Sequence, residues 1–229
     1  IHGTFISPRG ESGDDGGDGF INFVYRVSDG EHHLIVKQST LEARSKGSFT
    51  LDLNRYKLEY DAMKICAAIV PDLIPKLYDC DEENRVFITE DVSYLRISRF
   101  QLLKGVTYPK LADQIARYMA ATQFYTSEYY LDTKRFRDLS VHFMNTTMRK
   151  IMEVGMFLTS VTPEDTVGRP LDPEFITFSK RICADPAVLL ARQKLRHLFM
   201  SKGECLIHCD LHTSNIFASQ TEAKVIDME

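Results

Sequence analysis

The stretch His208-Cys209-Asp210-Leu211-His212-Thr213-Ser214-Asn215 decides how we interpret this chain of 229 residues. An aspartate and an asparagine stand five positions apart in it, and Asp227 comes twelve residues after Asn215, behind a short apolar run. Phosphoryl transfer from a metal-bound nucleotide uses this order of carboxylate, amide and second carboxylate. The pattern therefore predicts a kinase, whereas a turn followed by an edge strand is the plain structural alternative.

Each polar residue of this segment has a chemical role in that interpretation. We expect Asp210 to be catalytic, orienting the acceptor hydroxyl and taking its proton. Magnesium prefers hard oxygen ligands, and Asn215, Asp227 and Glu229 supply them. His208 is expected to hold the loop by hydrogen bonds rather than to titrate. His212 could face the substrate or solvent, and we place it with Asp210 on the substrate side.

A kinase also needs a phosphate-binding loop and a lysine upstream, in that order. The glycine-rich run 14–19 precedes an aromatic and β-branched stretch, 20–27, which is typical of a strand. Its glycines would let backbone amides approach phosphate, although the acidic Asp18 is unhelpful there and the run alone would indicate a disordered surface loop. Together with the downstream motif, Gly17, Asp18, Gly19 and Asn22 are our candidate nucleotide-binding residues. Ser28-Asp29-Gly30 predicts a hairpin turn, and the following strand, 34–37, would present Lys37 to the α and β phosphates.

The partner of Lys37 should be a glutamate on the next helix. Apolar residues recur at helical spacing from 51 to 70, and Pro71 and Pro75 end the pattern. Glu59 lies within this helix and is our candidate. Glu42 and Asp61 remain alternatives.

A second hairpin is predicted from 76–80 and 85–89, joined by the turn 81–84. The residues that leave it, Glu90, Asp91 and Val92, form the expected hinge, and their backbone would meet the adenine. The hinge divides the chain into residues 1–93, a small nucleotide-binding sheet lobe, and residues 94–229, a mainly helical lobe that carries the catalytic and metal loops.

The helical lobe is expected to contain three main helices. They cover residues 109–125, a methionine-rich stretch at 143–157, and 186–200, with a proline-containing loop at 161–173. The predicted fold class is therefore α+β, a bilobal protein-kinase-like fold with a small antiparallel sheet lobe and a helical lobe. Because helical lobes of small-molecule kinases normally continue beyond the metal strand, we expect the chain to be truncated at its C-terminus and the lobe to be incomplete.

Composition excludes several partners. The net charge is −4, so no basic field attracts nucleic acid or an anionic membrane, and no apolar run approaches the roughly 18 residues of a membrane span. The five cysteines lack metal-ligand spacing, which favours reduced thiols and a cytoplasmic location over a redox or zinc role for Cys205 and Cys209. A homodimer is compatible with the sequence.

Several motifs together resemble the 5-methylthioribose kinases, from about residue 14 to the end. They are listed here in chain order: Gly17-Asp18-Gly19 with Asn22-Phe23-Val24, Glu90-Asp91 with Ser93, 108–112, 124–127, Asp210-Leu211-His212-Thr213, and Asp227 with Glu229. The resemblance implies ATP and Mg²⁺ as cofactors and phosphorylation of the anomeric hydroxyl of 5-methylthioribose, a step of methionine salvage.

Four positions depart from that family. It usually has Gly at Cys209 and Ser214, Ser at Asn215, and Pro at Met228. Asn215 is the residue of choline kinases, aminoglycoside phosphotransferases and protein kinases, so it restores a general metal ligand. If position 209 needs a positive φ, cysteine costs about 1 kcal/mol there.

Two other functions remain open. A choline- or aminoglycoside-type phosphotransferase would keep the fold and the reaction and change the hydroxyl acceptor. A catalytically silent protein of the same fold would only bind or scaffold, although Lys37, Asp210, Asn215 and Asp227 favour catalysis.

Overall fold

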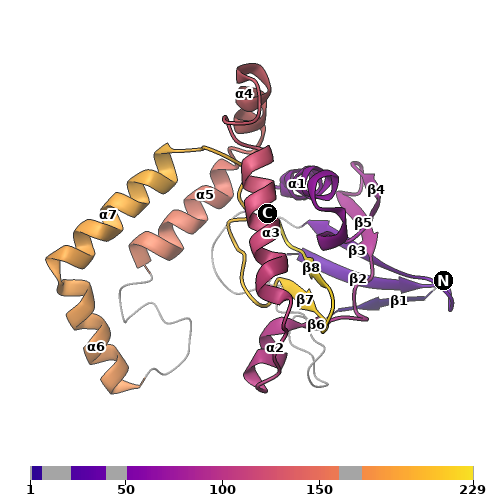
Figure 1. Ribbon diagram of the computed structural model, residues 1–229, viewed down its shortest axis with the longest axis horizontal. Helices are drawn as coiled ribbons and strands as arrows, with labels where there is room; N and C mark the ends of the chain where they lie inside the picture. Colours follow the sequence, from indigo (N-terminus) through magenta and orange to yellow (C-terminus); the bar gives the residue numbers. More distant parts are fainter. Residues whose placement is uncertain (1, 7–21, 40–50, 160–171, 229) are drawn as a thin grey trace. The chain divides into compact units, whose positions relative to one another are not determined.

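The computed structural model describes residues 2–6, 22–39, 51–159 and 172–228. It confirms the α+β class: an antiparallel sheet comes first and a mainly helical region follows (Figure 1). The chain forms two compact units, one of residues 1–143 with 205–229 and one of residues 144–204. The boundary near residue 93 that the hinge suggests stays a prediction.

The first unit is built on a five-stranded antiparallel sheet. Its strands are β1 (His2–Phe5), β2 (Asn22–Ser28), β3 (His33–Ser39), β4 (Leu77–Asp81) and β5 (Val86–Glu90), in the order β1-β2-β3-β5-β4. Both predicted hairpins are confirmed, because β2 pairs with β3 and β4 with β5. Strand β1 was not expected from the sequence.

The two hairpin turns have the local chemistry that their residues allow. Gly30 has φ of +100°, a conformation that glycine adopts without a steric penalty. In the second turn the Asp81 carboxylate accepts hydrogen bonds from the backbone N–H groups of Glu83 and Asn84, at 2.9 and 3.1 Å. The turns fix the strand register, which places Lys37 opposite Val24 on one side and Phe87 on the other.

Helix α1 (Arg55–Ile69) packs on this sheet near β3, β4 and β5 (Figure 1). It begins later than predicted, since the Asp52 carboxylate accepts the Asn54 N–H in a turn before the helix. It ends ahead of Pro71, which starts a short 3₁₀ turn, Pro71–Leu73. The main core forms around the helix from the buried residues Tyr56, Ala62, Met63, Cys66, Val70, Leu73, Ile74, Phe87, Tyr118, Val225 and Met228.

Beyond the hinge, the first unit continues with helices and a second small sheet. The helices are α2 (Ser98–Leu103), α3 (Leu111–Tyr125) and α4 (Thr133–His142). Strands β6 (Arg96–Ile97), β7 (Ile216–Ala218) and β8 (Ala223–Val225) pair antiparallel in the order β6-β7-β8. The segments that contain Asp210 and Asp227 adjoin this small sheet, one before β7 and one after β8.

The second unit contains α5 (Thr146–Met152), a π-helical segment (Glu153–Thr159), α6 (Pro173–Ala184) and α7 (Pro186–Ser201). The single methionine-rich helix predicted at 143–157 was wrong in its bounds. Asn145 adopts a left-handed backbone (φ of +39°) and its side chain accepts the Met148 N–H, so α5 begins only after it. The helix predicted at 186–200 is confirmed as α7, whereas α6 was not expected.

None of the helices among the described residues combines the length and the apolar character that a membrane span needs.

Candidate active site

An ion-pair network surrounds Lys37, at the middle of β3. Its Nζ lies 2.7 Å from Oε1 of Glu59 and also contacts Oδ1 of Asp227. The side chains of Lys37 and Glu59 are only 13% and 3% exposed. Such burial strengthens the attraction between the charges and makes the loss of either partner costly. The predicted lysine, its helix glutamate and the metal-loop aspartate therefore meet.

Glu59 reaches Lys37 because it lies on the buried face of α1. The buried positions of this helix are Arg55, Tyr56, Glu59, Ala62, Met63 and Cys66, which recur at helical spacing. Of the two alternatives for this pairing, Asp61 pairs instead with His142, at 2.9 Å, and Glu42 lies outside the described residues.

His208 joins the loop before β7 to the segment after β8. Its Nε2 lies 2.8 Å from the Ile226 carbonyl, and its Nδ1 accepts the Asp210 N–H at 3.3 Å. Since a carbonyl only accepts, Nε2 carries the hydrogen and the ring is neutral. Burial lowers the pKa of His208, which favours this neutral form. The geometry agrees with a structural role for this residue.

The side-chain amide of Asn215 contacts Asp210. Its Nδ2 donates to the Asp210 backbone carbonyl at 3.0 Å and lies 3.4 Å from Oδ2 of the same residue. The Asn215 carbonyl accepts the Ile226 N–H at 3.0 Å, which brings the segment of Asp227 beside this loop. Contacts thus run continuously from Asp210 through Asn215 and Ile226 toward Asp227 and Lys37.

His212 lies beside the Asp210 carboxylate. Its Nδ1 accepts the Ser214 N–H at 3.1 Å, which leaves the hydrogen of the neutral ring on Nε2. Nε2 is 3.5 Å from Oδ2 of Asp210, the oxygen that Asn215 also approaches. About half of each side chain of this histidine–aspartate pair is exposed. Oδ1 of Asp210 is therefore the oxygen turned away from both neighbours.

The backbone at two of these positions is left-handed. Cys209 has φ of +66° and Asp227 has φ of +70°. Position 209 thus has the conformation that glycine adopts most easily, and a cysteine there carries strain of about 1 kcal/mol. Met228, the residue in place of proline, is buried in the main core and needs no special backbone.

The hinge side chains are engaged within the protein. Arg26 forms an ion pair with Asp91 at 2.7 Å, and the Ser93 N–H donates to the same carboxylate. The Glu90 N–H donates to the Lys76 carbonyl, and its carboxylate accepts the Lys76 N–H at 3.0 Å. Val92 is buried. The side chains of Glu90 and Asp91 therefore make contacts within the protein that hold this segment in place.

The remaining predicted residues lie at the edge of what the structure describes. Asn22 is buried at the start of β2, and its Oδ1 is 3.5 Å from the Ser39 hydroxyl. Gly17, Asp18, Gly19 and Glu229 lie outside the described residues. Within the described part of the chain, no three or more His, Cys, Asp or Glu side chains are grouped to hold a metal. Two predicted oxygen ligands, Asn215 and Asp227, come from adjacent loops.

Sequence reasoning missed residues that position the site. Ser98 and Arg99, at the start of α2, both donate to the Thr213 carbonyl, at 2.8 and 3.0 Å, and so fix the loop that contains Asp210. Lys224 is buried near the hinge glutamate. Only its place three residues before Asp227 could have drawn attention to it.

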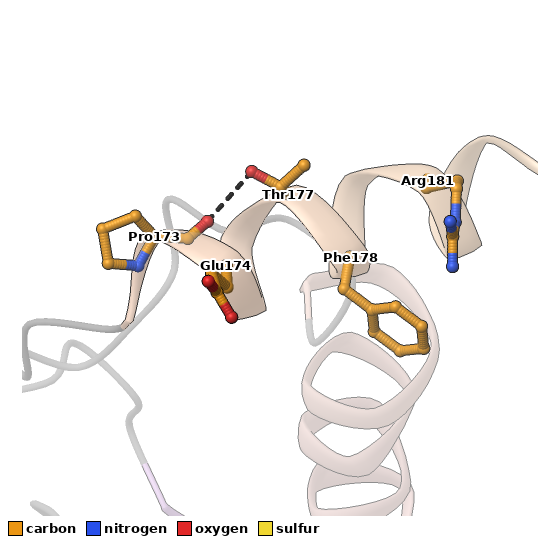
Figure 2. Close-up of a pocket in the computed structure, with 5 residues that line it drawn as sticks. All are labelled: Pro173, Glu174, Thr177, Phe178 and Arg181. Atoms are coloured by element: carbon orange, nitrogen blue, oxygen red, sulfur yellow. Dashed lines mark hydrogen bonds between the residues drawn. The ribbon is translucent and has the colours of Figure 1, made fainter.

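An open hollow in the second unit contains none of the predicted site residues. It follows α6 and is lined by Pro173, Glu174, Thr177, Phe178 and Arg181 (Figure 2). Thr177 Oγ1 donates to the Pro173 carbonyl at 2.9 Å, an ordinary bond within a helix. All five residues belong to one helix, so the hollow is part of its surface rather than an enclosed site.

The order of these elements is that of the kinase class: a sheet with a lysine paired to a helix glutamate, a hinge, and a helical region whose two loops carry Asp210, Asn215 and Asp227. The chain is homologous over its full length to methylthioribose kinases. It is 36% identical over 229 residues to the enzyme of Bacillus cereus strain ATCC 10987 and of Bacillus anthracis, and 35% identical to that of Bacillus cereus strain G9842. In each case the alignment covers 100% of this chain and 58% of the length of the relative. No protein-family model matches the chain.

Proposed function

We propose that the chain carries the ATP- and magnesium-binding site of a small-molecule kinase that phosphorylates the anomeric hydroxyl of 5-methylthioribose. The observation that supports this most strongly is the convergence of Lys37, Glu59 and Asp227, since these residues come from three distant segments of the sequence. The full-length relatives are named methylthioribose kinases, which supports the choice of acceptor.

On the nucleotide side, Lys37 would pair with the α and β phosphates. Glu59 holds the amine in place, so its position is set before nucleotide arrives. The hinge backbone at Glu90, Asp91 and Val92 would meet the adenine. Gly17, Asp18, Gly19 and Asn22 would cover the phosphates as part of the same proposal.

On the metal side, the residues present fit Mg²⁺. Asp227 offers a carboxylate, and Asn215 offers an amide oxygen, because its Nδ2 is turned toward Asp210. Glu229 would complete the protein ligands. A bound Mg²⁺ supplies positive charge against the phosphates. Asp227 would hold the cation, and Lys37, paired with Glu59, would contact the phosphates.

On the acceptor side, Asp210 would orient the hydroxyl and take its proton through Oδ1. Asn215 and His212 both lie against Oδ2, which fixes the rotation of the carboxylate. His212 is close enough to the carboxylate to contact the acceptor as well.

A reducing cytoplasmic location is part of the proposal. It is compatible with the free cysteines among the described residues.

The direct test is product analysis with labelled ATP and a panel of acceptors: 5-methylthioribose, ribose, choline and an aminoglycoside. We expect Mg²⁺-dependent label in methylthioribose 1-phosphate and none with Asp210→Ala. Transfer only to choline or the aminoglycoside would overturn the acceptor and keep the kinase. ATP binding without transfer to any acceptor would favour a silent binding protein.

A further inference from the structure

We propose that Lys224 is a positioning residue that ties the hinge to the strand leading to Asp227. The inference rests on the proposed function and concerns how the adenine-binding and metal-binding parts of that site are kept at a fixed spacing. Lys224 is a buried cation to which the proposed phosphoryl transfer assigns no role.

Lys224 lies in the middle of β8, and only 8% of the residue is exposed. Its Nζ donates to the Ile74 carbonyl at 3.0 Å and is 3.8 Å from Oε2 of Glu90. Lysine is rarely buried so completely, because removing its charge from water is costly unless polar partners surround it. The partners here are the end of the 3₁₀ turn and the hinge carboxylate.

Glu90 is itself fixed on several sides. Its Oε2 accepts the Lys76 N–H at 3.0 Å, and its own N–H donates to the Lys76 carbonyl at 2.8 Å. The Tyr94 hydroxyl is 3.4 Å from Oε1. The carboxylate thus joins the end of β5, the segment before β4 and the first residues beyond the hinge, and Lys224 adds β8 to this junction.

Lys224 connects this junction to Asp227, because the two residues are three positions apart in the sequence. Asp227 follows Lys224 by three residues, and between them the Ile226 N–H donates to the Asn215 carbonyl at 3.0 Å. Asp227 in turn contacts Lys37. A nucleotide that spans hinge and metal loop needs these two parts at one separation. The Lys224–Glu90 pair supplies a link between them that bypasses the phosphate-binding residues.

The test compares hydrogen exchange at two reporter amides in the nucleotide-free chain, those of Glu90 and Ile226. In Glu90→Gln one oxygen can still accept the Lys76 N–H, whereas the charge facing Lys224 is lost and the contact with the Tyr94 hydroxyl is altered. We expect the distant Ile226 amide to exchange at least about tenfold faster in this variant, and in Lys224→Met as well, and the double variant to add little. The matched control is Lys57→Met, which removes the exposed ion pair of Lys57 on α1 with Glu82 in the β4–β5 turn and should change neither amide.

Affinity for Mg²⁺-ATP provides the functional readout, and about tenfold weaker binding is expected for Glu90→Gln and Lys224→Met while the Lys57→Met value stays unchanged. An unchanged Ile226 exchange rate in Glu90→Gln would overturn the inference, whether or not Lys224→Met folds. Absence of ATP binding in the unaltered chain would instead overturn the proposed function, because the exchange measurement requires no nucleotide.

Discussion

Nζ of Lys37 and Oε1 of Glu59 are 2.7 Å apart in a region where both side chains are almost completely buried. Glu59→Ala would remove the helix carboxylate from a lysine whose side chain is only 13% exposed. We expect the free energy of unfolding to fall by about 3 kcal/mol, and kcat/KM for ATP to fall with it. Urea unfolding and steady-state kinetics measure the two effects.

The matched control for this pair is the exposed ion pair of Lys57 with Glu82. Glu82→Ala should leave the stability almost unchanged, because exposed ion pairs contribute little. An equal loss in both variants would mean that burial does not set the strength of the Lys37–Glu59 pair.

Asp210→Asn tests the base directly. The amide keeps the shape of the side chain and cannot take a proton, so we expect kcat to fall by about 10²-fold to 10⁴-fold with little change in ATP affinity. His212→Gln, which keeps a donor near the position of Nε2, should retain far more activity than His212→Phe. Near-normal turnover of Asp210→Asn would remove this residue from the catalytic role.

The backbone at Cys209 can be tested without reference to activity. Cys209→Gly and Cys209→Ala both remove the thiol, and they differ in how well they adopt a φ of +66°. The glycine variant should be more stable than the alanine variant by about 1 kcal/mol, measured by chemical unfolding. Equal stabilities would show that this backbone conformation is not strained.

The burial of His208 predicts how the stability of the folded chain depends on pH. Burial lowers its pKa in the folded chain below the value of 6.5 for an ordinary histidine, so the unfolded chain binds the extra proton first as the pH falls. Stability should therefore be fully present above about pH 6.5 and decrease as the pH falls through the lowered pKa. Denaturation at several pH values in metal-free buffer should show a steeper loss for the unaltered chain than for His208→Gln. Parallel profiles would contradict a neutral, buried His208.

The hairpins, α7, and the approximate place of α1 and α3 could be predicted because their signals are local. Turn residues such as Asp29 and Gly30 and the prolines at 71 and 75 determine where elements end, whatever the rest of the chain does. The interruption at Asn145 could not be predicted, because apolar spacing around it continues and only the left-handed backbone shows the break.

The meeting of Lys37, Glu59 and Asp227 could be predicted because each of these residue types is tied to a motif, whereas the catalytic role of Asp210 stays a prediction. Burial was not readable. Glu59 is buried on α1, although a glutamate on a helix is usually exposed to solvent, and only its pairing with Lys37 explains this burial. The roles of Arg26 with Asp91 and of Lys224 with Glu90 depend on contacts across 65 and 134 positions, which no local pattern encodes.

The most direct test of the central claim is the affinity for ATP with and without Mg²⁺, measured by calorimetry on the unaltered chain and on Asp227→Ala. We predict that Mg²⁺ tightens ATP binding by at least about tenfold in the unaltered chain and by less than about twofold in the variant, because the proposed role of Asp227 is to hold the metal beside the nucleotide. An identical effect of Mg²⁺ in both proteins would contradict the account, as would the absence of ATP binding.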